Sequence, residues 1–131
     1  MLQIIGTIPH LTDTTCEALL CQQYWHRGEL VTDVNVLFLK ASNHLWGRFF
    51  FDYGVLFWKQ VDAPDIWHTT AQDEFHYPQI DLGKSYNLVS RKIRGIEAID
   101  SKPYPVVSIR FSLNTTLTLA DGGDQMMLTI E

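Results

Sequence analysis

Residues 46–60 read WGRFFFDYGVLFWKQ, with seven aromatic rings in fifteen positions. Asp52-Tyr53-Gly54 divides this stretch into two apolar runs, and turn residues at this spacing are typical of a β-hairpin. Side chains alternate along a strand, so Phe49 and Phe51 share one face of the first run while Arg48 and Phe50 share the other. Aromatic rings on both faces indicate that both sides of the sheet are at least partly covered.

The segments around this hairpin predict further strands. Residues 34–41 read VNVLFLKA and are joined to the hairpin by a second turn, which makes a three-stranded antiparallel meander. Residues 106–113 (VVSIRFSL), 116–120 (TLTLA) and 126–130 (MMLTI) show the same alternation, with the DGGD turn before the last. Residues 2–8 form another short apolar run, and residues 86–99 are predicted as a long strand broken or bulged near Gly95.

One segment favours a helix, near Asp13–His26. Asp13 is a suitable N-cap, Ala18 and its neighbours are good helix formers, and Gly28 is typical of a helix end. The sequence therefore predicts an α+β fold that is mainly antiparallel β, with about eight strands in a meander or half-barrel and this N-terminal helix packed on the sheet. At 131 residues, the chain is expected to form a single domain, residues 1–131.

The composition, 46% hydrophobic and 19% charged, is that of a globular protein. No apolar run reaches the roughly 18 residues of a membrane span, and the start of the chain lacks the pattern of a secretory signal. We therefore expect a soluble, cytoplasmic protein that does not bind membranes. Cys16 and Cys21 would point apart on the predicted helix, which predicts two reduced thiols.

The formal net charge of −5 argues against nucleic-acid binding, which usually requires a basic surface. Residues 62–83 contain five carboxylates and no lysine or arginine, so this segment accounts for the whole excess. A connection of this length between strands is longer than usual, and long loops carry function more often than cores do.

The acidic segment is also aromatic, which suggests a surface that binds a basic protein partner. The partner-binding candidates are Trp67, His68, Asp73, Glu74, His76 and Tyr77. The small size, net acidity and hairpin-rich pattern are similar to those of some immunity proteins that neutralise toxins, a likeness of type that assigns no residue. A homo-oligomer is compatible with the same sequence.

The alternative is a barrel-like protein that holds a small ligand in an aromatic-lined interior. Its candidate ligand-binding residues are Arg48, Phe49, Phe57 and Trp58. The partner-binding and ligand-binding hypotheses differ in which aromatic side chains they expect to be exposed to solvent.

An enzyme is the least favoured interpretation. His68 and His76, with Asp73 or Glu74, supply groups for acid–base or metal chemistry, but their spacing matches neither H-x-H nor H-E-x-x-H. Nucleophile-elbow, phosphate-loop and dinucleotide motifs are absent from the sequence. The sequence assigns no catalytic residue, no metal and no cofactor.

Overall fold

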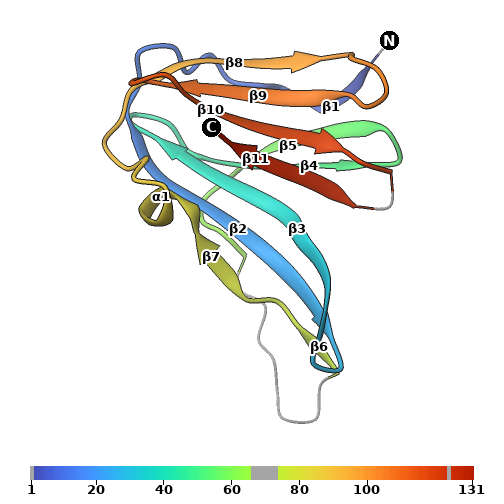
Figure 1. The fold of residues 1–131 in the computed structure, drawn as a ribbon. Coiled ribbons are helices and arrows are strands. Elements are labelled where there is room, and N and C mark those ends of the chain that lie inside the picture. Colours follow the sequence, from blue (N-terminus) through green and yellow to red (C-terminus); the bar gives the residue numbers. More distant parts are fainter. Residues whose placement is uncertain (1, 66–73, 124) are drawn as a thin grey trace.

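Two β-sheets lie face to face in the computed structural model, which describes residues 2–65, 74–123 and 125–131 (Figure 1). The strands are β1 (Gln3–Gly6), β2 (Cys16–His26), β3 (Glu29–Ala41), β4 (Trp46–Asp52), β5 (Val55–Val61), β6 (Phe75–His76), β7 (Gln79–Asp81), β8 (Ile93–Ile99), β9 (Val106–Phe111), β10 (Thr115–Asp121) and β11 (Met126–Ile130). One short helix, α1 (Leu82–Ser85), follows β7 and packs beside β2.

The larger sheet has seven strands in the order β1-β5-β4-β3-β2-β6, and β7 pairs with β2 next to β6. The smaller sheet has four strands in the order β11-β10-β9-β8. The strands pair antiparallel except β1, which runs parallel to β5. The mainly antiparallel β character predicted from the sequence is confirmed, but the strands form two layers and are more numerous than expected.

The hairpin of residues 46–60 is confirmed as β4 and β5, paired from Trp46↔Val61 to Asp52↔Val55. Tyr53 and Gly54 at its turn have φ values of 51° and 75°, as a two-residue hairpin loop requires. The bulge expected near Gly95 is also present, as a register shift between Ile93 and Gly95 in β8. The predicted long strand over residues 86–99 is wrong in its first half, because residues 86–92 lie mostly in turns and the strand begins at Ile93.

The predicted helix near Asp13–His26 is wrong, because residues 16–26 form β2. Arg27 and Gly28 have φ values of 51° and 78°, so they form the two-residue turn of a hairpin with β3. Pairing along the whole of β2 outweighs the helix propensity of Ala18 and its neighbours, which amounts to only tenths of a kcal/mol per residue. Gly28 therefore lies in a hairpin turn and does not terminate a helix.

The core lies between the two sheets. Phe49 and Trp58 face each other across β4 and β5 and stack with their ring centroids 4.2 Å apart. The same cluster contains Ile109 and Leu117 of the smaller sheet. Phe57 points to the outer face and is only half-buried.

The two cysteines are free thiols on β2, and both are buried in the core. Five positions apart, they would normally lie on opposite faces of a strand. A register shift between Cys16 and Ala18 moves Cys16 to the same face as Leu19 and Cys21. Burial raises the pKa of Cys16 to about 11 and the pKa of Cys21 to about 12, from an ordinary value of 9.0.

These raised pKa values predict a loss of stability at high pH. The unfolded thiols ionise near pH 9 while the folded thiols stay neutral, so the stabilising contribution is complete below about pH 9 and is lost as the pH rises toward about 12. Urea unfolding of the wild type and of the double variant Cys16→Ala/Cys21→Ala should show a shallower decline above pH 9 in the variant. Equal declines in the two proteins would show that the loss of stability comes from groups other than these two thiols.

Candidate functional site

The most prominent surface feature is an arm that extends beyond the sandwich (Figure 1). We define the arm as residues 23–33, the outer part of the β2–β3 hairpin, together with residues 74–77, which include β6. β3 pairs with β4 only from Leu37 to Lys40, and its register with β2 shifts between Gln22 and Tyr24. Beyond this point the hairpin leaves β4, and β6 becomes its third strand.

Four stacked rings cover one face of the arm. His26 stacks on Phe75 with their centroids 5.1 Å apart, and Tyr24 stacks on Phe75 at 6.0 Å and on Tyr77 at 5.2 Å. We call this set the aromatic ladder. It forms because His26 and Phe75 are paired residues of adjacent strands, whose side chains share a face. Phe75 keeps 47% of its surface exposed, so the ladder is not a closed core.

The opposite face of the arm carries Trp25. Its indole Nε1–H donates to Gln23 Oε1 at 3.0 Å, and Gln23 Nε2 donates to Asp33 Oδ1 at 2.8 Å. This chain of hydrogen bonds fixes the indole against the strand. Leu30, opposite Trp25 on β3, is 46% exposed.

Two described carboxylates of residues 62–83, Glu74 and Asp65, lie close to basic side chains that are distant in the sequence. Glu74 Oε1 lies 2.9 Å from Arg27 Nη2, and its other oxygen lies 3.5 Å from His26 Nε2. Asp65 lies 3.4 Å from Arg48 Nε. Both pairs are at least partly exposed, so each is worth only about 0–1 kcal/mol. Asp81 instead accepts a hydrogen bond from the backbone N–H of Lys84 and caps α1.

The structure places three of the six partner-binding candidates on the arm, namely Glu74, His76 and Tyr77. Trp67, His68 and Asp73 lie outside the described residues. Sequence reasoning missed Tyr24, Trp25 and His26 because it placed them at the end of a helix. Strand-favouring aromatic residues directly before Arg27-Gly28 were the signal that could have identified them.

Three of the four ligand-binding candidates line one pocket. Arg48, Phe57 and Trp58 border a pocket of about 230 Å³ between β1, β4 and β5. The Arg48 guanidinium lies 5.0 Å from the centroid of the Phe50 ring, which stacks on Phe57. Phe49 does not line this pocket, because it is fully buried in the core on the other face of β4.

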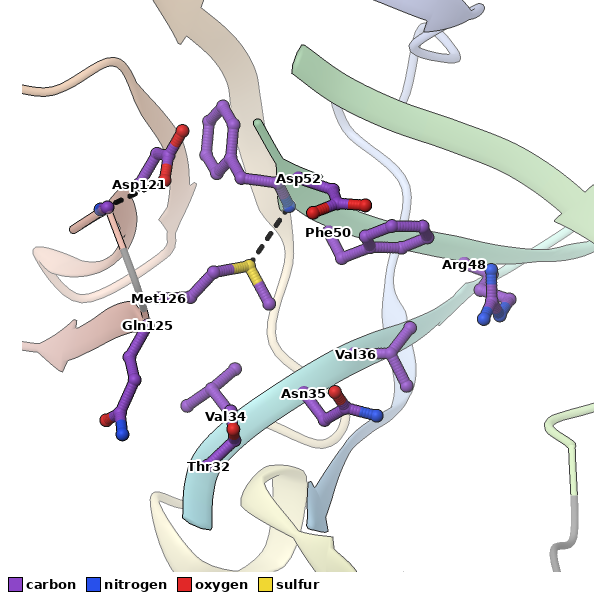
Figure 2. Close-up of a pocket in the computed structure, with 12 residues that line it drawn as sticks. Thr32, Val34, Asn35, Val36, Arg48, Phe50, Asp52, Asp121, Gln125 and Met126 are labelled. Carbon is purple, nitrogen blue, oxygen red and sulfur yellow. Dashed lines mark hydrogen bonds between the residues drawn. The ribbon is translucent and has the colours of Figure 1, made fainter. Parts of the chain in front are cut away.

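A second pocket, of about 270 Å³, lies where β3 diverges from β4 (Figure 2). Met126 reaches across from β11, and its Sδ accepts a hydrogen bond of 3.0 Å from the Phe51 backbone N–H. The pairing of β3 with β4 ends before Phe51, so the sulfur accepts from a backbone N–H that has no acceptor on β3. Asp121 also lines the pocket, where it accepts from the Gly123 N–H in the β10–β11 turn. These contacts join the two sheets, so they indicate a structural role for the residues around this pocket.

Within the described ranges, no group of three or more His, Cys, Asp or Glu residues is arranged to hold a metal ion. The described part of the chain also contains no helix long and apolar enough to cross a membrane. Comparisons with protein families, curated proteins and solved structures find no match to this chain.

Proposed function

We propose that this chain is a small non-catalytic interaction domain whose arm binds a protein partner with a basic surface. The observation that supports the proposal most is the aromatic ladder, which lies half-exposed on an arm that projects from the sandwich. Neutralising a basic toxin, as immunity proteins do, is one role of this type.

The ladder has the chemistry of an interface anchor. Tyrosine and other large rings dominate the binding energy of protein interfaces, because they bury a large area at a small cost in side-chain entropy. In the ladder, Phe75 lies between Tyr24 and His26, so its orientation is fixed before a partner arrives. A rigid ring loses less conformational entropy on binding than a mobile one.

The charge of the arm favours a basic partner. Its described residues include three carboxylates, Glu29, Asp33 and Glu74, and one guanidinium, Arg27, which leaves a local excess of two negative charges. Glu29 and Asp33 are exposed to solvent. Exposed charges of this kind attract an oppositely charged surface and accelerate association, and added salt weakens the effect.

A small-ligand binder is the second candidate, because Arg48, Phe57 and Trp58 meet at one pocket. It ranks lower because about 230 Å³ is below the 300–1,000 Å³ range of typical ligand sites. In addition, Arg48 already interacts with Asp65 and with the Phe50 ring.

The proposal predicts that an arm variant loses its partner. Wild type and the variant Glu29→Gln/Phe75→Ser serve as baits for extracts of the native cell, and each recovered protein is purified and titrated by calorimetry. We expect a basic protein that binds the arm variant at least about tenfold more weakly than wild type, and that binds wild type more weakly as salt is raised.

The matched control is Glu97→Gln/Tyr53→Ser, which makes an equivalent change at exposed positions outside the arm. It should bind as wild type does. Equal affinity of all three baits for each recovered protein would show that the arm is not the recognition surface.

A further inference from the structure

The smaller sheet leaves part of the larger sheet uncovered. β10 packs on β4 and β11 packs on β3, so the smaller sheet ends at β11. β2 and β7 lie beyond this edge, and α1 follows β7 at the side away from β11 (Figure 1).

A groove of about 480 Å³ lies along this uncovered strip. Cys21 and Val34 line it from β2 and β3, Ile80 and Leu82 from the side of β7 and α1, and Leu128 from β11. Ile80 is 36% exposed although it lies opposite Cys21, which is buried. The groove therefore continues the core with a mixed lining, in which the polar side chains of Gln23, Asp33 and Ser85 accompany the apolar ones, and no strand covers it in the described part of the chain.

The edge of β11 beside this groove has backbone groups available for pairing. Thr116 and Glu131 exchange two backbone hydrogen bonds, of 2.8 and 3.0 Å. Because such pairs alternate along an antiparallel ladder, the N–H and C=O groups of Met126, Leu128 and Ile130 point away from β10. Among the described residues, no strand pairs with β11 on that side. An open edge of this kind is a template for another extended chain.

Charge sets one further requirement on the occupant. Among the described residues that line the groove, only Asp33 carries a formal charge, and its side chain is exposed. The hydrogen bond from Gln23 Nε2 occupies only part of its accepting capacity. An occupant with a cation at this point would be favoured over one with an anion.

We propose that the groove binds an extended segment of a partner protein, which pairs with the free edge of β11. Alternate apolar side chains of the segment fill the space between Leu128 and Ile80, and a lysine or arginine lies beside Asp33. Cys21 and Gln23 face the groove, whereas Tyr24 and His26 belong to the aromatic ladder on the opposite face of the arm. The groove and the ladder therefore lie on opposite faces of the arm, although Asp33 contributes both to the charge of the arm and to the lining of the groove.

The first test uses a library of short random peptides displayed on phage and selected on the immobilised protein. Enriched peptides should alternate apolar residues and carry a lysine or arginine. Their affinity, measured by titration with synthetic peptide, should fall about tenfold or more for Asp33→Lys and stay unchanged for Glu97→Lys, a charge reversal on β8 in the other sheet. Both residues are exposed, so both variants should fold.

The second test examines backbone pairing. The amide protons of Leu128 and Ile130 should exchange rapidly in the free protein and slowly in the complex. N-methylation of alternate peptide residues should abolish binding in one register, which faces β11, and leave it intact in the other.

Three results would overturn the proposal: no enriched peptide, enriched peptides that bind Asp33→Lys as tightly as wild type, or binding without protection of these two amides. A dimer in sedimentation whose interface protects Leu128 and Ile130 would show that a second copy of this chain occupies the groove. In that case the occupant of the groove would be a second copy of this chain and not a segment of a partner protein, and the proposal would be wrong. The Glu29→Gln/Phe75→Ser variant changes the arm at two residues that do not line the groove, so its loss of binding bears on the proposed function and not on the groove.

Discussion

Trp58→Ala is expected to lower the free energy of unfolding by about 3–5 kcal/mol, which is the range for truncating a large buried ring. Trp58 is 2% exposed and stacks on Phe49 with an angle of 8° between the ring planes. Its indole also lies over Gly47, where an added Cβ would come within 3.0 Å of Nε1. The paired backbones of β4 and β5 cannot collapse into the vacated space, so most of the cavity remains.

One feature of Trp58 opposes this loss. Its Nε1–H is buried without a hydrogen-bond partner, and a buried unsatisfied donor costs about 1–3 kcal/mol. Trp58→Phe removes that donor and keeps a ring against Phe49, so its effect should be clearly smaller than that of alanine. Urea unfolding of both variants measures the difference.

Tyr53→Ala is the matched control, because Tyr53 lies at the turn of the same hairpin and is 95% exposed. Its free energy of unfolding should stay within about 0.5 kcal/mol of wild type. If Trp58→Ala and Tyr53→Ala had equal effects, the ring of Trp58 would not be part of the core.

Phe38→Ala is expected to cost a similar amount, about 3–5 kcal/mol, although Phe38 lies outside the core between the sheets. Phe38 is opposite Arg48 on the outer face of the larger sheet, yet none of its surface is exposed. Asp65, which follows β5, lies on this face: it contacts Arg48 in β4, and its carbonyl accepts a hydrogen bond from Gln79 in β7. Truncating a phenylalanine that is fully buried on this face leaves a cavity.

Leu113→Ala provides the comparison for Phe38, because Leu113 is 80% exposed and should change the free energy of unfolding by no more than about 0.5 kcal/mol. Phe38→Leu keeps most of the apolar volume and should cost less than alanine. A loss below about 1 kcal/mol for Phe38→Ala would mean that the outer face is open to water in solution.

Part of the candidate site was accessible to sequence reasoning. Glu74, His76 and Tyr77 were selected because acidic and aromatic residues concentrate in residues 62–83, and these three lie on the arm. Tyr24 and His26 were not selected, although they complete the aromatic ladder. Their partner Phe75 is about fifty positions away in the sequence, and no local pattern records a contact over that separation.

The sequence alone determined the hairpin of residues 46–60 and the strands that end the chain. In these segments the turn residues, the period of two and the pairing partners are all neighbours, so the local pattern contains the interactions that form the structure.

Only the tertiary structure decided the state of residues 16–26 and the division of the strands into two sheets. Ala18, Leu19 and Leu20 favour a helix locally, but burial of Leu19 between the sheets and pairing with β3 stabilise a strand. The same holds for β1, which pairs with β5 across some fifty residues of intervening chain. Such contacts depend on where the remaining strands lie, which is why the arm and the groove beside β11 emerge only from the assembled fold.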